Sequence, residues 1–468
     1  MTGAPGSGHA AAGAGRQCAE PGTPSRPRRE RPRPAAPATG ARQALGTVVT
    51  KVGSLLLGMA ASVVVARALQ PTGRGTYHLI TTIAGTAIAL GHLSVEQAQT
   101  TLWAQPRYRL AVAANSLPLG AAVGVFAMMV ASALVALAGS ALTPPYLALV
   151  GPALVGVPLG ICGLYITNIT VLKARMATAN RAALAGSVFQ CGFLIALGLA
   201  GRLTVASVVV IWVASMAVPC CVVACAGRLG PRGFDPSVAW RTVTTGLSYH
   251  LGPASLYLLL RADVFILAAQ VSTRLVGIYS LAVGVVEMSR FAADSVSQVA
   301  LSRQVHASDR ESAEVTARMT RLTALAGAAS VLAVVVVAPI VVPLAYGLSY
   351  AGAVPLLLLL APGLLALGAS RPVSAYLLRF HRARFVVVPS VSALVVNVAL
   401  NLVLIPELGA VGCSIASSVG YVTMAALQVR LFVRASGIRA CSLLPRRADV
   451  RTFVAELRAV CRRAPTRR

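Results

Sequence analysis

The sequence predicts an all-α integral membrane protein of about twelve transmembrane helices. Of its 468 residues, 56% are hydrophobic and 12% are charged, against roughly 25% charged in a soluble domain, and the mean hydropathy is +0.75. Apolar runs of about 20 residues, the length that an α-helix needs to cross a hydrocarbon core of about 30 Å, recur along the chain. Arginines cluster between alternate runs. We therefore expect most of the chain to lie in the bilayer.

Twelve apolar runs bounded by charges, proline or glycine qualify as spans. A tilted or broken helix near Gly347 or Pro406 would change this count. The predicted spans lie near 46–68, 77–97, 113–138, 145–167, 182–200, 204–226, 248–270, 276–300, 322–345, 354–378, 385–405 and 409–434.

Arginine placement predicts the orientation, because basic residues near span ends stay on the cytoplasmic side. The odd-numbered connections carry only Arg67, Arg74, Arg202 and Arg274, whereas every even-numbered connection carries two or more basic residues. The segments before the first span and after the last are also rich in arginine. Both termini are therefore expected in the cytoplasm, which requires an even number of spans.

A short motif recurs in the two halves of the chain. Gly75-Thr-Tyr-His-Leu79 opens the second span and Gly277-Ile-Tyr-Ser-Leu281 opens the eighth. The matching position, span count and sidedness favour two parallel six-helix bundles, as in many transporters. We assign the bundles to 43–227 and 248–434, a cytoplasmic linker to 228–247 and basic cytoplasmic tails to 1–42 and 435–468. The first tail, rich in Pro, Ala, Gly and Arg, is expected to be disordered.

Several function classes are disfavoured by what the sequence lacks. It has no phosphate-binding G-x-x-x-x-G-K-[ST] loop. The outer connections are too short for a catalytic domain, and their only evident acid is Glu407, so neither an enzyme nor a membrane-embedded glycan polymerase is expected. The nine cysteines have no metal-ligand spacing with histidine, and we expect no cofactor. The net charge of +28 is spread between spans, which argues against a nucleic-acid partner.

Ionisable residues inside spans cost roughly 2.5 to 3.5 kcal/mol each at mid-bilayer and therefore mark candidate sites. Arg261 and Asp263 are two residues apart on one helix, so each needs a partner from another helix, which favours a polar cavity between helices. Glu287, Arg290 and Asp294 are spaced by three and four residues and therefore share one helix face, where a local ion pair and a binding role are both open. Asn397 and Asn401 share a face one turn apart. The charged candidates are Arg261, Asp263, Glu287, Arg290, Asp294 and Arg371.

Four stretches carry a family resemblance. They are Ala66-Arg-Ala-Leu-Gln-Pro-Thr-Gly-Arg-Gly-Thr-Tyr77, then Arg261-Ala-Asp263 with Val276-Gly-Ile-Tyr-Ser-Leu-Ala282, then Tyr346-Gly-Leu-Ser-Tyr-Ala-Gly-Ala353, and Asn397-Val-Ala-Leu-Asn401 with Ile405-Pro-Glu-Leu-Gly-Ala-Val-Gly412. With these motifs in this order along the sequence, the chain resembles the bacterial polysaccharide-biosynthesis exporters of the Wzx type. They are a branch of the multidrug, oligosaccharidyl-lipid and polysaccharide exporter superfamily. The likeness covers roughly residues 43–434.

The resemblance implies a flippase that carries an undecaprenyl-diphosphate-linked oligosaccharide across the cytoplasmic membrane by alternating access, for cell-surface polysaccharide synthesis. Membrane lipids and other polysaccharide-assembly proteins are the partners to expect. We hypothesise that Arg261, Arg290 and Arg371 bind the diphosphate, because guanidinium groups bind phosphate bidentately. The acids Asp263, Glu287 and Asp294 would balance these charges or couple transport to H⁺ or Na⁺, and Asn397 and Asn401 would add polar groups to the cavity.

A second function stays open on the same fold. A cation-coupled exporter of small, often cationic molecules would need a cavity dominated by acids and aromatic rings, whereas aromatic residues make up 5% of this chain.

Overall fold

The computed structural model describes residues 37–138, 144–226, 233–304, 309–380, 384–451 and 455. Contacts within the chain divide it into Met1–Arg42 and Gln43–Arg468, and the second unit contains every described helix apart from the first few residues of α1. The described secondary structure is entirely helical. The elements are α1 (Pro37–Gly91), α2 (Val95–Trp103), η1 (Pro106–Tyr108), α3 (Arg109–Leu137), α4 (Pro144–Leu154), α5 (Gly156–Leu172), α6 (Met176–Leu199), α7 (Val205–Ala226), α8 (Pro236–Gln270), α9 (Thr273–Gln304), α10 (Asp309–Val341), η2 (Val342–Tyr346), η3 (Leu348–Tyr350), α11 (Ala353–Ala369), α12 (Arg371–Phe380), α13 (Arg384–Leu408), α14 (Ala410–Ser436) and η4 (Ala440–Leu443).

In the described part of the chain, ten helical stretches are long and apolar enough to cross a membrane, judged by length and composition. The first of them, Gly46–Trp103, contains both α1 and α2. Each of the twelve predicted apolar runs falls in helical structure, so the all-helical prediction is confirmed. The break expected near Gly347 is a short η2–η3 turn, and Pro406 lies within α13.

The first predicted connection is a kink at a single residue. Gln70 has φ 53° and ψ 174°, and helical structure continues on both sides of it. Pro71 accounts for the break in the helix, because proline disfavours the α conformation in the residue before it and fits the first position of a new helix. α1 therefore consists of two helical arms, Pro37–Leu69 and Pro71–Gly91, and we call the end of the molecule at Gln70 the kink end.

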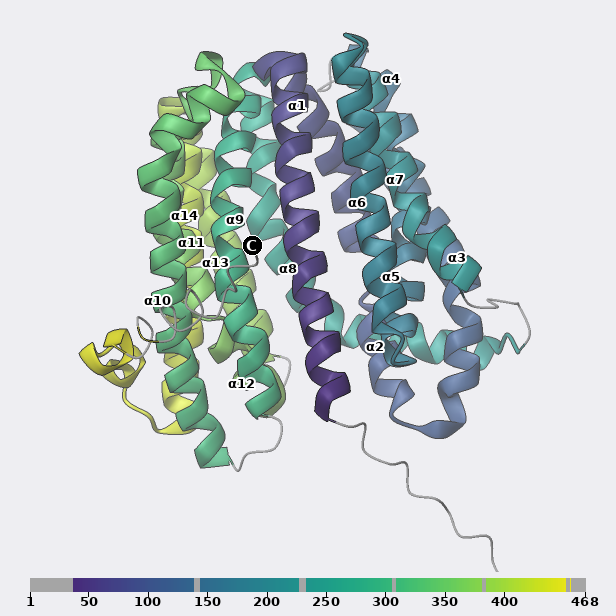
Figure 1. Ribbon diagram of the computed structural model, residues 1–468, viewed down its shortest axis with the longest axis vertical. Helices are drawn as coiled ribbons and strands as arrows, with labels where there is room; N and C mark the ends of the chain where they lie inside the picture. Colours follow the sequence, from purple (N-terminus) through teal and green to yellow (C-terminus); the bar gives the residue numbers. More distant parts are fainter. Residues whose placement is uncertain are drawn as a thin grey trace, which may run out of the picture. The chain divides into compact units, whose positions relative to one another are not determined.

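The helices gather into two sets with α1 between them (Figure 1). On one side α3, α5, α6 and α7 pack together, and on the other α9, α10, α11, α13 and α14 pack together. The second arm of α1 joins both cores, because Leu79 packs in the cluster of the second half and Ile80 in that of the first. The boundaries assigned to the two six-helix bundles stay a prediction.

The two halves meet closely at the kink end. A Cβ atom on Gly75 would collide with the carbonyl oxygen of Thr273, and one on Gly277 would collide with the carbonyl oxygen of Pro71. The recurring Gly-x-Tyr-x-Leu motifs thus lie back to back, and only glycine permits this approach of the two backbones. Arg67 adds hydrogen bonds from Nε to the Ala345 carbonyl (2.7 Å) and from Nη2 to that of Leu344 (2.6 Å).

Two predicted cytoplasmic segments contain ordered helix. α8 begins at Pro236, within the predicted linker, because Asp235 caps it by accepting hydrogen bonds from the amides of Ser237 and Val238 and proline suits the first helical position. In the predicted C-terminal tail, η4 lies against α10, where Arg321 contacts Asp449 at 2.7 Å. The predicted first tail lies almost entirely outside the described residues.

Candidate functional site

An ion pair joins α8 and α9 at two of the candidate residues predicted from the sequence. Nη2 of Arg261 lies 3.2 Å from Oε2 of Glu287, and each side chain retains 25% of its exposure. The partner of Arg261 thus comes from a neighbouring helix, as expected from the spacing. The side chains of Arg290 and Asp294 lie outside the described residues, so the local ion pair and the binding role of this group both stay predictions.

Two further basic side chains lie near this pair, both from the second arm of α1. Arg74 donates hydrogen bonds to the carbonyl (3.1 Å) and the hydroxyl (3.2 Å) of Ser62 and to the hydroxyl of Ser280 (3.4 Å). One turn further along the same face of α1 lies His78. Arg74 and Arg261 therefore border the seam between α1, α8 and α9, since each contacts a side chain of α9.

The sequence-based prediction missed both Arg74 and His78. It placed Arg74 in a connection, whereas the helix resumes directly after Gln70 and includes it. The spacing of four residues between Arg74 and His78 would have indicated a shared face had the helix been extended back to Pro71. The Pro71 signal, which favours a helix start, was available for this purpose.

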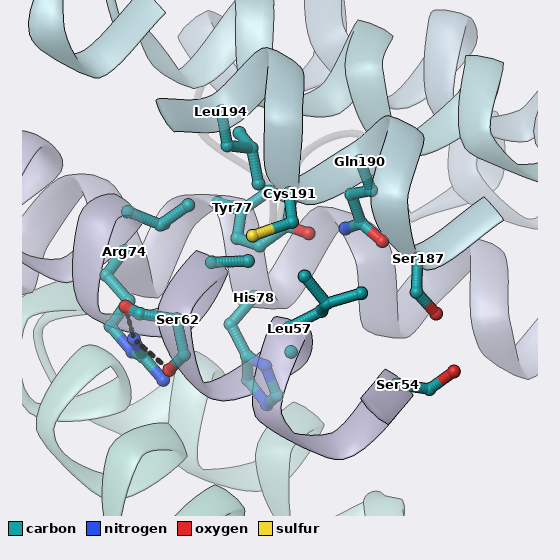
Figure 2. A pocket seen from close by; sticks show the side chains of 13 residues that line it. Ser54, Leu57, Ser62, Arg74, Tyr77, His78, Ser187, Gln190, Cys191 and Leu194 are labelled. Atoms are coloured by element: carbon teal, nitrogen blue, oxygen red, sulfur yellow. Dashed lines mark hydrogen bonds between the residues drawn. The ribbon is translucent and has the colours of Figure 1, made fainter. Parts of the chain in front are cut away.

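A polar pocket of about 200 Å³ opens beside Arg74 and His78 (Figure 2). Its walls come from the two arms of α1 and from α6. Among the described residues, none of its lining side chains is a carboxylate. The lining residues are Ser54, Leu57, Gly58, Ala61, Ser62, Val65, Arg74, Tyr77, His78, Ser187, Gln190, Cys191 and Leu194.

Asp263 faces away from this seam into the interior of the second half. It is 1% exposed and accepts hydrogen bonds from the hydroxyl of Tyr279, from the hydroxyl of Ser417 (2.8 Å) and from the amide of Val264 (2.8 Å). Arg261 and Asp263 thus point to different sides of α8, as expected. The hydrogen bonds of Asp263 are with hydroxyls and an amide, so its direct role here is to order α8, α9 and α14.

The two asparagines extend the same buried network. Asn397 donates to the Ser417 hydroxyl at 3.4 Å, and Asn401 donates to the carbonyl and side-chain oxygens of Asn397 at 2.9 and 3.1 Å. Both are 0% exposed. Asn397 and Asn401 therefore hydrogen-bond within the contact between α13 and α14, and their role in a cavity stays a prediction.

Replacement of Asp263 with alanine should therefore destabilise the protein. The hydroxyls of Tyr279 and Ser417 would lose a common acceptor, and each unsatisfied buried group costs about 1 to 3 kcal/mol. We expect a clearly lower Tm for the detergent-solubilised protein, with a smaller decrease for Asp263→Asn, which keeps an acceptor oxygen. A wild-type Tm for Asp263→Ala combined with lost transport would instead place Asp263 in ion coupling.

Arg371 belongs to a second cavity. It begins α12 and lines this cavity of about 260 Å³ with Ser370, Ser374 and Gln428, between α8, α11, α12 and α14. The structure brings together Arg261 and Glu287, and it places Arg371 in the lining of a different cavity from the one beside Arg74. A diphosphate site formed by Arg261, Arg290 and Arg371 stays a prediction, because the side chain of Arg290 lies outside the described residues.

The fold is that of multi-pass membrane transporters of the MOP superfamily. An inward-facing multidrug resistance MATE family transporter of that superfamily aligns with a TM-score of 0.67 at 16% identity, covering 84% of this chain and 98% of the other. The lipid II flippase MurJ in an inward closed conformation aligns with a TM-score of 0.64 at 11% identity, covering 90% and 93%. A MOP superfamily transporter from Pyrococcus furiosus, described as having a binding pocket of reverse polarity, aligns with a TM-score of 0.63 at 15% identity, covering 85% and 95%.

The family follows from the sequence itself. Residues 64–355 match the model of the family described as polysaccharide biosynthesis protein, and the chain belongs to that family. No curated protein matches the chain. The resemblance found in the sequence motifs is thereby confirmed, and the fold is shared with the transporters named above.

Proposed function

We propose that this protein is a flippase that moves an undecaprenyl-diphosphate-linked oligosaccharide across the cytoplasmic membrane by alternating access. The observation that carries the proposal is the cationic seam, in which Arg74 of α1 and Arg261 of α8 both contact side chains of α9, Ser280 and Glu287. Among the described side chains, the one acid that forms an ion pair in this seam is Glu287, which contacts Arg261. Such a site is complementary to a diphosphate, which accepts bidentate hydrogen bonds from guanidinium groups. Membership of the polysaccharide biosynthesis family supports the same substrate class.

The proposed topology has twelve spans. The two arms of α1 are separate spans, α4 with α5 and α11 with α12 each form one broken span, and α3, α6, α7, α8, α9, α10, α13 and α14 supply the rest. The arginine-poor connections then lie at the kink end, which faces outward, and both termini are cytoplasmic.

Glu287 has a defined part in this mechanism. Without substrate it neutralises Arg261, which makes a partly desolvated arginine tolerable between the halves. An entering diphosphate competes for the same guanidinium and releases the carboxylate. A released carboxylate can take up H⁺ or Na⁺, and in this way substrate binding and an ion gradient become linked.

The closed contacts at the kink end supply the second element of alternating access. Arg67 and the Gly75–Gly277 crossing hold the outer ends of the halves together, and Tyr350 donates a hydrogen bond to the Ala66 carbonyl at 3.1 Å. In the outward-open state these contacts must separate.

The rival function, export of small cations, fits this chemistry poorly. A cationic drug needs negative charge, and the pocket beside Arg74 has no carboxylate among its described lining residues. The charge sign of the seam thus favours an anionic substrate.

Gene deletion tests the proposal against its rival. Loss of the protein should make lipid-linked oligosaccharide accumulate on the cytoplasmic face of the membrane, and plasmid-borne protein should restore export. The measurement is the accessibility of the extracted and labelled glycan lipid in right-side-out and inverted vesicles. Unchanged glycan export together with altered drug tolerance would reject the flippase and favour the rival.

A further inference from the structure

The pocket between α1 and α6 has polar side chains for which the diphosphate hypothesis has no use. Ser187 and Gln190 lie on one face of α6 and turn their polar ends toward the first arm of α1, which carries Ser54 (Figure 2). The two helices are fixed against each other nearby, since Asn180 donates to the Thr47 hydroxyl at 3.1 Å and Cys191 packs with Val65. The packing of α1 against α6 therefore fixes the walls of the pocket within the first half.

Two polar atoms of this pocket have no hydrogen-bond partner among the described residues. Oγ of Ser54 and Nε2 of His78 are both shielded from bulk solvent. Such groups cost free energy when left unsatisfied in the folded protein, and a native structure keeps few of them. Both side chains belong to the lining of one pocket, where a ligand that displaces the adjoining side chains meets two free hydrogen-bonding groups.

The chemistry of the lining selects the kind of molecule. Serine hydroxyls, the Gln190 amide and an imidazole each donate as well as accept hydrogen bonds. Apart from Arg74 at its edge, the described lining carries no fixed charge, and Leu57, Leu194 and the Tyr77 ring supply apolar surface. A neutral sugar has the matching pattern, with hydroxyl groups that donate and accept around a ring whose C–H face is apolar.

We infer that this pocket binds the sugar attached directly to the diphosphate of the carried lipid, and that it selects a neutral pyranose. The inference rests on the proposed flippase function and deepens it. Arg74 lines the pocket and also contacts Ser280 of α9, the helix whose Glu287 pairs with Arg261, so a diphosphate held along this seam places the first sugar between α1 and α6. Gln190 and Ser54 are then specificity residues, and Arg261 serves every lipid diphosphate regardless of its sugar.

Binding measurements on the purified full-length protein in nanodiscs test this assignment. The probes are undecaprenyl diphosphate and its conjugates with a single neutral hexose or N-acetylhexosamine. We expect the wild type to bind at least one conjugate more tightly than the bare lipid. Gln190→Leu and Ser54→Ala should weaken binding of that conjugate about tenfold, the effect of one or two lost hydrogen bonds, and leave the bare lipid unaffected.

Matched controls are Gln270→Leu and Ser248→Ala, which change the same residue types at exposed positions of α8 outside the pocket lining. Equal wild-type affinity for bare and conjugated lipid would overturn the inference, and so would equal weakening of both by Gln190→Leu. If the wild type bound none of these lipids, the proposed function itself would fail.

Discussion

Replacement of Arg261 with alanine is expected to abolish transport of lipid-linked oligosaccharide while the protein stays in the membrane at its normal level. The substitution removes the guanidinium that faces the seam and leaves Glu287, its partner at 3.2 Å, as an uncompensated negative charge in the substrate path. Two charge-assisted hydrogen bonds to a diphosphate are lost at the same time. We expect lipid diphosphate affinity to fall about 100-fold or more, measured by binding in nanodiscs and by flipping in proteoliposomes.

Three variants separate the causes of this loss. Arg261→Lys keeps the charge but not the bidentate geometry and should retain part of the activity. Glu287→Gln removes the competing carboxylate, so it should keep or tighten diphosphate binding while changing the dependence of transport on an ion gradient. In Arg261→Ala/Glu287→Ala the uncompensated charge is gone, and a remaining defect reports the substrate contact alone. Normal transport by Arg261→Ala would remove this residue from the site.

Valine at Gly75 or Gly277 is expected to block transport by forcing the halves apart at the kink end. A Cβ on Gly75 would also lie 2.9 Å from the amide nitrogen of Gly277, and a Cβ on Gly277 would lie 3.0 Å from that of Gly75. These obstacles are backbone atoms, which cannot rotate away. The closed contact is therefore lost, and with it one of the two states that alternating access requires.

Cross-linking reports this change directly. The amide oxygen of Gln70 and the hydroxyl of Ser349 lie 3.4 Å apart across the kink end, so the pair Gln70→Cys/Ser349→Cys should be joined readily by a short bifunctional thiol cross-linker that spans the length lost with the glutamine side chain. Gly75→Val should reduce the yield sharply. Gly284→Val is the matched control, because a Cβ there meets no atom within 4 Å. Equal cross-linking in Gly75→Val and Gly284→Val would contradict the proposed role of the glycine crossing.

Local sequence signals sufficed for part of the site. The two-residue spacing of Arg261 and Asp263 predicted different partners, and the structure gives Glu287 to one and Tyr279 with Ser417 to the other. The recurrence of Gly75 and Gly277 was read as a sign of duplication. That the two glycines touch each other was not predictable, because a repeat indicates equivalent positions and says nothing about their distance.

Other errors came from treating span limits as helix limits. Hydropathy placed the seventh span at 248–270, but the helix begins at Pro236 because Asp235 caps it. The same assumption placed Arg74 in a connection, so its position on the same helix face as His78 was not predicted. In both places proline marked the true start of the helix.

The sequence by itself determined a helical membrane protein, the approximate position of its helices and the family to which it belongs, because hydropathy and motifs are properties of contiguous residues. The tertiary structure decided which charges lie together. It set Arg74 of α1 and Arg261 of α8 against the same helix, α9, placed Arg371 in the lining of another cavity and enclosed Asp263 in a buried network. Those choices depend on how helices rotate and cross, and helix rotation is set by packing between segments far apart in the chain.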